Sequence, residues 1–144
     1  MKMADGFPTK ILIVDDKETV RESLASRFRL ESSLFKVSTA QGGDEALELL
    51  KHQWFDVVLC DRVLRHGMDG IAVTREITSR HAGIRVVVFT DKEDHEDTKL
   101  HVLRAGAYSY FSKPIHFDEL LHGIGTINSV RRTEYLGKSF RTLA

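Results

Sequence analysis

Three short runs of aliphatic residues constrain the fold of this chain more than any other feature. They lie at Lys10–Val14, Asp56–Cys60 and Arg85–Phe89, and few polar side chains interrupt them. A strand with one exposed face alternates apolar and polar residues, whereas a strand covered on both faces has a continuous apolar run. These runs therefore predict buried parallel strands that lie between two layers of helices.

Two weaker segments, Phe35–Ala40 and Ala107–Phe111, complete the predicted set of strands. Between the strands, apolar residues recur every three or four positions, which is the period of an amphipathic helix. These positions are Val20, Leu24 and Phe28; Ala46, Leu47, Leu49 and Leu50; Ile71, Thr74 and Ile77; Leu100 and Leu103; and Phe117, Leu120, Leu121, Ile124 and Ile127. A strand and a helix that alternate in this way predict an α/β fold with a doubly wound (βα)5 parallel sheet.

The composition of the chain restricts its class. Its 144 residues, 42% of them hydrophobic, are enough to bury the core of one domain. The 21 basic and 21 acidic residues cancel, so we expect no direct nucleic-acid binding by this domain. The apolar runs are far shorter than the roughly 20 residues that span a membrane, and the N-terminus lacks a secretory signal. One cysteine, Cys60, allows no internal disulfide, and we expect a cytoplasmic protein.

Acidic and other polar residues follow the predicted strands, at the edge where open α/β sheets bind ligands. Asp15 and Asp16 follow the first strand, Asp61 follows the third, Thr90 follows the fourth, and Lys113 comes after the fifth. If the first, third and fourth strands are neighbours, these side chains converge on one crevice.

Three carboxylates in one crevice repel one another, each pair by about 4 kcal/mol at a separation of ~4 Å and an effective dielectric near 20. A raised pKa on one acid or a bound cation relieves this repulsion. Oxygen ligands without His or Cys favour a hard ion, and Mg²⁺ fits best. A carboxylate beside Mg²⁺ can attack a phosphoryl group to form an aspartyl-phosphate, while a hydroxyl and an ammonium hold the remaining oxygens.

Over about 120 of its 144 residues, the sequence resembles the response-regulator receiver family of two-component signalling. The matching motifs are Ile11–Asp16, Val57–Asp61, Met68–Gly70, Val87–Thr90 and Ala105–Pro114. The resemblance implies a flavodoxin-like fold with strand order 2-1-3-4-5. It divides the chain into an N-terminal extension at residues 1–9, a receiver domain at 10–130, and a basic tail or start of a linker at 131–144.

By this resemblance, Asp61 is the phosphoacceptor. Asp15, Asp16 and Asp61 hold Mg²⁺, together with the backbone carbonyl of Val63. Lys113 pairs with the phosphoryl oxygens. The protein then catalyses only its own phosphorylation and dephosphorylation, and it turns over no other substrate.

Thr90 is expected to act in two ways, by assisting the transfer and by forming a switch with Tyr110. The switch couples the pocket to a face made of the fourth helix, the fifth strand and the fifth helix. We expect a histidine kinase or phosphotransfer protein as the phosphodonor, with partner binding or homodimerisation through that face as the response. The resemblance leaves room for an output domain after residue 144, and the peptide bond before Pro114 is expected to be cis.

The sequence departs from the family pattern around the acceptor and the switch threonine. Arg65 stands where a proline is usual, and Gly67 is a one-residue insertion. Asp91 follows the threonine at a position that is usually small, so an extra acid can crowd or repel an incoming phosphodonor. Neither Val63 nor Lys92 is a base or an orienting group for a hydrolytic water, which predicts a long-lived phosphoryl-aspartate.

Two other functions remain open at this point. A pseudo-receiver keeps the fold but takes no phosphoryl group, and Asp91 and the altered loop are compatible with one. A Mg²⁺-dependent phosphohydrolase of the haloacid-dehalogenase type also uses an aspartate nucleophile, but it places that residue after its first strand, with a second acid two residues on. Here the first strand is followed by the adjacent acids Asp15 and Asp16, and the candidate nucleophile follows the third strand, which favours the receiver.

Overall fold

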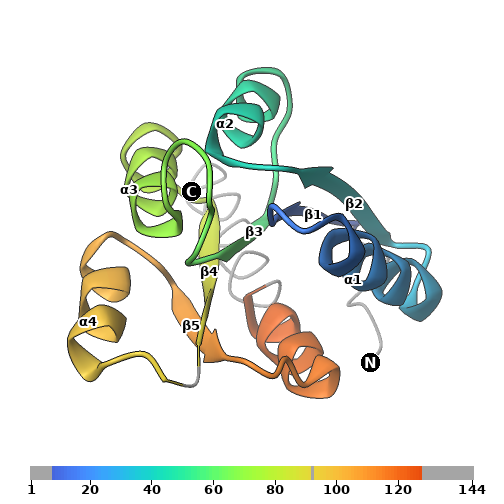
Figure 1. Ribbon diagram of the computed structural model, residues 1–144. Coiled ribbons are helices and arrows are strands. Elements are labelled where there is room, and N and C mark those ends of the chain that lie inside the picture. Colours follow the sequence, from blue (N-terminus) through green and yellow to red (C-terminus); the bar gives the residue numbers. More distant parts are fainter. Residues whose placement is uncertain (1–7, 92, 128–144) are drawn as a thin grey trace, which may run out of the picture.

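The computed structural model describes residues 8–91 and 93–127. In this part of the chain, five parallel strands form one sheet in the order β2-β1-β3-β4-β5 (Figure 1). The strands are β1 (Thr9–Val14), β2 (Phe35–Ala40), β3 (Val57–Asp61), β4 (Arg85–Thr90) and β5 (Ser109–Ser112). The helices between them are α1 (Glu18–Glu31), α2 (Gly43–His52), α3 (Gly70–Arg80) and α4 (Glu96–Arg104), and a last helix covers residues 117–127. The predicted flavodoxin-like α/β fold and its strand order are confirmed.

The sheet separates two apolar layers (Figure 1). Successive side chains of a strand point to opposite faces. Leu12 and Val14 of β1 therefore pack in the layer that α2, α3 and α4 cover, while Ile11 and Ile13 pack in the layer of α1 and the last helix. Strands covered on both faces explain why the runs in β1, β3 and β4 are continuously apolar.

Phe28 joins α1 to the last helix in the second of these layers. Its side chain is fully buried. Its ring meets the ring of Phe35 at 5.3 Å and the ring of Phe117 at 4.9 Å, both edge to face. Aromatic pairs in this geometry add to the free energy gained by burying their area, so this contact fixes α1 against the start of the last helix.

The fifth strand begins two residues later than predicted, at Ser109 instead of Ala107. Ala107 still belongs to the turn that ends α4, because its N–H donates to the carbonyl of Val102 in that helix. Gly106 has a φ of 109°, a conformation that side chains disfavour and that ends the helix. The aliphatic pattern did not separate this helix end from the strand.

The register of the strands brings their carboxyl ends to one edge. Val14 of β1 pairs with Cys60 of β3, and Asp61 pairs with Phe89 of β4. Thr90, the last residue of β4, pairs with Ser112. The expectation that the first, third and fourth strands are neighbours is therefore confirmed, and their polar end residues share this edge.

Gly70 is the residue that allows α3 to begin close against the end of β3. Its N–H donates to the carbonyl of Arg62 at 2.9 Å. A Cβ added to Gly70 would overlap the carbonyl oxygen of Asp61 and lie 2.6 Å from Cα of Arg62. Both obstacles are backbone atoms, so a larger residue forces the loop after Asp61 to move.

We therefore expect Gly70→Ala to lower the free energy of unfolding by about 1–3 kcal/mol, as overpacking does in other cores. Urea denaturation measures this change. Gly42→Ala is the matched control, since the nearest atom to an added Cβ there lies 3.9 Å away. The control should cost less than about 1 kcal/mol, which is the loss of a good N-cap residue. Equal losses in the two variants would show that the close approach at Gly70 is unimportant.

Candidate functional site

Three carboxylates lie together at the carboxyl edge of the sheet. One ligand oxygen from each of Asp15, Asp16 and Asp61 lies within 4.8 Å of the others. Asp15 and Asp61 are buried, and Asp16 is half-buried. Asp15 and Asp16 follow β1, and Asp61 ends β3, so neighbouring strands bring together acids that are 45 or more residues apart. The structure thus places the three predicted metal ligands in one group.

The carboxylate of Asp61 is held at both of its oxygens. Its Oδ2 lies 2.9 Å from Nζ of Lys113, which donates to it, and its Oδ1 accepts from the backbone N–H of Val63 at 3.2 Å. The side chain of Asp61 is only 3% exposed. This partly buried ion pair keeps a cation beside a carboxylate whose other charged neighbours in the group are acids. Lys113 lies where the sequence placed it, and the carbonyl of Val63 as a metal ligand stays a prediction.

Asp15 is fixed by the start of α1. Its Oδ1 accepts from the N–H of Lys17 at 2.8 Å, and its backbone carbonyl accepts from Nη1 of Arg21 at 2.8 Å. Burial raises the pKa of Asp15 above its ordinary value of 3.8, and the charges of Asp61 and Asp16 raise it further. The N–H of Lys17 and the charge of Lys113 offset only part of this rise. The carboxylates therefore repel one another even with Lys113 beside them.

Asp16 is fixed by the loop after β3. Its Oδ2 accepts from the backbone N–H of Arg65 at 3.1 Å, and Nε of the same residue lies 3.9 Å away. A proline has no N–H, so the usual residue of the family could not make this bond. The departure at Arg65 thus gives the loop a direct hydrogen bond to the acidic group.

The other carboxylate oxygen of Asp16, Oδ1, is buried and has no hydrogen-bond partner within the described residues. A buried charged oxygen without a partner is costly. It belongs to a group of oxygen donors only, and hard divalent cations such as Mg²⁺ prefer such donors. The side chains present therefore fit a Mg²⁺ ion.

The predicted switch residues lie on the neighbouring strands β4 and β5. Thr90 is fully buried, and its Oγ1 lies 3.4 Å from Oγ of Ser112. Tyr110 is half-buried and packs against the layer of α2, α3 and α4, with Nζ of Lys99 5.8 Å from the centre of its ring. Ser112 was not among the predicted site residues, because only the register of β4 and β5 shows that it faces Thr90.

The segment after β5 carries Lys113 to the site. The N–H of Lys113 donates to the carbonyl of Thr90 at 2.8 Å. The peptide bond between Lys113 and Pro114 is cis, as predicted. This turn holds the ammonium beside Asp61 while the chain continues into the last helix.

Two residues at the rim of the site, Arg62 and Asp94, are not among those that the sequence predicted. The guanidinium of Arg62 forms a two-bond ion pair with the carboxylate of Asp94, at 2.7 and 2.9 Å. Arg62 follows Asp61 directly, so its position beside the acidic group could be read from the sequence. Its partner could not, because Asp94 is 32 residues away. Lys92, considered above for its effect on hydrolysis, lies outside the described residues.

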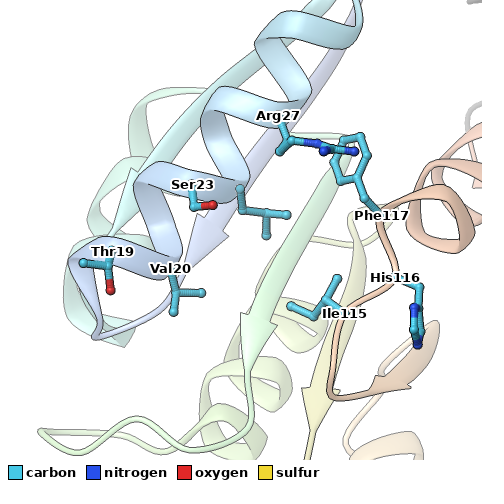
Figure 2. Close-up of a pocket in the computed structure, with 8 residues that line it drawn as sticks. Thr19, Val20, Ser23, Arg27, Ile115, His116 and Phe117 are labelled. Carbon is cyan, nitrogen blue, oxygen red and sulfur yellow. The ribbon is translucent and has the colours of Figure 1, made fainter.

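A separate groove of about 610 Å³ lies between α1 and the segment that enters the last helix (Figure 2). Arg27 lies over the ring of Phe117, at 4.5 Å from its centre. The groove is lined by Thr19, Val20, Ser23, Leu24, Arg27, Ile115, His116 and Phe117. No predicted site residue lines it, although its two walls follow Asp16 and Lys113 closely in sequence.

Within the described residues, no helix has the length and apolar character needed to cross a bilayer.

Comparison with known proteins agrees with the fold. The family model of the response regulator receiver domain matches residues 11–125. The response regulator MprA of Mycobacterium sp. strain KMS is 38% identical over 115 residues, which make up 80% of this chain and 48% of that protein. The transcriptional regulatory protein ZraR of Escherichia coli K12 is 37% identical over 110 residues, 76% of this chain and 24% of that protein. The receiver domain of NtrX from Brucella abortus matches with a TM-score of 0.76 and 28% identity, over 83% of this chain and 98% of that one.

The chain therefore belongs to the response-regulator receiver family. This is a family of signalling domains, and the assignment gives no support to the phosphohydrolase alternative. The chain spans about half the length of MprA and about a quarter of ZraR. The matched range lies inside the predicted domain of residues 10–130. The limits of that domain stay predictions, since residues 1–7 and 128–144 lie outside the described part.

The repulsion among the carboxylates predicts that Asp15→Asn stabilises the protein when no metal is bound. Asparagine keeps an oxygen for the N–H of Lys17 but removes one negative charge. In the presence of EDTA at neutral pH, we expect the free energy of unfolding to rise by about 1–2 kcal/mol. Urea denaturation measures it, with Glu22→Gln as a control on the exposed face of α1.

The pH dependence of this gain follows from the raised pKa of Asp15. An acid whose pKa is raised on folding does not lower the free energy of unfolding at a pH below its ordinary pKa. It lowers that free energy most at a pH above its pKa in the folded protein. The advantage of Asp15→Asn should therefore shrink as the pH falls from neutral toward 3.8. Mg²⁺ should stabilise the wild type more than the variant. A variant less stable than the wild type at neutral pH would contradict the repulsion assigned here.

Proposed function

We propose that this protein is a phosphoacceptor switch of a two-component phosphorelay, in which Asp61 takes a phosphoryl group from a histidine kinase or phosphotransfer protein. The surroundings of Asp61 carry the proposal. Its carboxylate is buried, two other carboxylates have oxygens within 4.8 Å, and the Lys113 ammonium lies at 2.9 Å. An aspartate nucleophile for a phosphoryl group needs such a setting, with an acidic metal site on one side and a cation on the other.

In the transfer, one oxygen of Asp61 forms a bond to phosphorus while the bond from phosphorus to the leaving group breaks. With a phosphohistidine donor, the P–N bond breaks and the imidazole leaves and takes up a proton. With acetyl phosphate, the P–O bond breaks and acetate leaves. Asp61 thereby becomes a mixed anhydride, and the phosphoryl group brings roughly two negative charges to a buried position.

The other side chains of the site have separate roles in this step. Lys113 already donates to Asp61 and would pair with a phosphoryl oxygen after transfer, while the hydroxyl of Thr90 would donate to another. Asp15, Asp16 and Asp61, with the carbonyl of Val63, would hold Mg²⁺. When bound, this ion neutralises charge on the transferring oxygens.

Thr90 and Tyr110 would convert the new charge into a change of packing. The Thr90 hydroxyl lies 3.4 Å from Oγ of Ser112 on β5, and it would turn its proton toward a phosphoryl oxygen. Tyr110 lies on the same strand as Ser112 and is half-buried, so a move inward would remove more of its ring from water. The phosphoryl group favours the packing in which Thr90 contacts it, and this shifts the population of the two arrangements.

The surface that would respond is the face of α4, β5 and the last helix. Its helix α4 carries exposed apolar side chains, with Leu100 46% exposed and Leu103 41% exposed. This face would bind a partner or a second copy of the chain. An output domain after residue 144 agrees with the greater length of MprA and ZraR. The balanced charge gives this domain no general affinity for nucleic acid, and its one cysteine suits the cytoplasm.

Incubation with acetyl phosphate tests the acceptor directly. We expect intact-protein mass to rise by one phosphoryl group in the presence of Mg²⁺ and not in EDTA. The gain should be absent from Asp61→Asn, which keeps the shape of the side chain but not its nucleophile. Asp118→Asn removes an exposed carboxylate of the last helix and should be labelled like the wild type.

A folded wild type that gains no phosphoryl group from acetyl phosphate or from phosphoramidate would overturn the proposal. That result would favour a pseudo-receiver, which binds its partner without phosphorylation. Labelling that persists in Asp61→Asn would show that the acceptor is another residue.

The lifetime of the phosphoryl group gives a second test. Val63 is 40% exposed and lies two residues beyond the acceptor, but its side chain can neither donate nor accept a hydrogen bond. It therefore cannot orient a water for attack on phosphorus, and we expect the phosphoryl-aspartate to last minutes or longer without a phosphatase. Val63→Asn should shorten the half-life severalfold and Val63→Ala should not, as measured by intact mass after removal of the donor. A half-life of only seconds in the wild type would contradict this expectation.

A further inference from the structure

Arg62 links the strand of the acceptor to the loop after β4. It is the residue directly after Asp61, and its guanidinium grips the carboxylate of Asp94. Nε donates to Oδ2 at 2.7 Å, and Nη2 donates to Oδ1 at 2.9 Å. The side chains are 25% and 11% exposed, respectively. A two-bond pair that is mostly shielded from water holds its geometry better than a surface ion pair does.

Arg62 contacts two acids of the loop after β4, Asp91 and Asp94, which are joined by hydrogen bonds and are called the acidic turn below. The N–H of Asp94 donates to the carbonyl of Asp91 at 3.0 Å, and the N–H of Asp91 donates to Oδ2 of Asp94 at 2.9 Å. The carboxylate of Asp91 lies 3.8 Å from Nη2 of Arg62 and is 49% exposed. One guanidinium therefore faces two carboxylates, and the exposed Glu93 adds a third acid to this segment.

This acidic turn lies at the rim of the acceptor site. The N–H of Arg62 donates to the carbonyl of Phe89 at 2.9 Å, so Arg62 continues the pairing of β3 with β4. Asp91 follows Thr90, whose carbonyl accepts from the N–H of Lys113 at 2.8 Å. The turn therefore begins beside the residues that would surround the phosphoryl group.

We infer that Arg62 is a positioning residue for phosphorylation, which holds the acidic turn in place and offsets its charge so that an anionic phosphodonor can approach Asp61. The inference rests on the proposed function and adds a determinant of donor choice to it. Phosphodonors are anions, and two uncompensated carboxylates at the rim would repel them in proportion to their charge. Arg62 reduces that repulsion. Its two-bond ion pair with Asp94 also keeps the acidic turn from moving over Asp61.

The test compares two donors of different charge. At neutral pH, acetyl phosphate carries two negative charges and phosphoramidate carries one net negative charge. In Arg62→Gln, we expect the labelling rate with acetyl phosphate to fall by about three- to tenfold at low ionic strength, and the rate with phosphoramidate to fall less. Both losses should diminish at high salt, which screens the rim. Arg62→Lys keeps the charge without the two-bond geometry and should fall between wild type and Arg62→Gln.

A matched control and a variant with the opposite effect separate this role from damage to the fold. Arg80→Gln also removes one arginine charge and one carboxylate contact, the 2.9 Å pair with Glu76, but it lies at the far end of α3. It should leave labelling unchanged with both donors. Asp91→Asn removes a negative charge from the rim and should speed labelling by acetyl phosphate about threefold, a gain that misfolding cannot produce. Combined with Arg62→Gln, it should restore part of the lost rate.

The outcomes distinguish the inference from the proposed function. If the wild type is labelled and Arg62→Gln is labelled equally fast by both donors, the inference is wrong and the proposed function stands. Equal losses with both donors, unchanged by salt, would also overturn it, because they indicate a structural effect without a role for charge. If the wild type takes no phosphoryl group from either donor, the proposed function fails and this inference fails with it.

Discussion

The repulsion among Asp15, Asp16 and Asp61 is the constraint on which the rest of this structure depends. Two neighbouring strands deliver three carboxylates to one point, and burial makes their charges harder to tolerate. Lys113, at 2.9 Å from Asp61, offsets part of this negative charge, and a backbone N–H donates a hydrogen bond to each of the three acids. Even so, burial first and then the charges of Asp61 and Asp16 raise the pKa of Asp15 above its ordinary value. A cation bound at this edge of the sheet would relieve the remaining repulsion.

The sequence was sufficient to predict the fold and the members of the acidic group. Continuous apolar runs predicted the buried strands. With β1, β3 and β4 as neighbours, the polar residues at their ends lie close together. The sequence could not predict the contacts that depend on strand register or on the conformation of the loops. The facing hydroxyls of Thr90 and Ser112 depend on the register of two strands, and the grip of Arg62 on Asp94 joins loops that are 32 residues apart. The early start predicted for β5 has a similar cause, since the hydrogen bond from Ala107 to Val102 belongs to the end of α4.

The departures from the family pattern have definite physical roles in the structure. Arg65 supplies a backbone N–H to Asp16 that a proline would lack. Asp91, an acid at a position that is usually small, lies 3.8 Å from the guanidinium of Arg62, so part of its charge is compensated. Read one at a time, these residues suggest a damaged receiver. Their contacts show that Arg65 and Asp91 each have a partner of opposite charge, Asp16 and Arg62 respectively.

The separation of the core into two layers has a consequence for how the protein meets other molecules. The groove between α1 and Phe117 belongs to one side of the sheet, whereas Tyr110 packs into the layer on the other side (Figures 1 and 2). The groove and the layer around Tyr110 have no residue in common. Substitutions on the α1 wall of the groove, at Thr19 or Ser23, therefore change one side of the domain and leave the packing of Tyr110 on the other side unchanged.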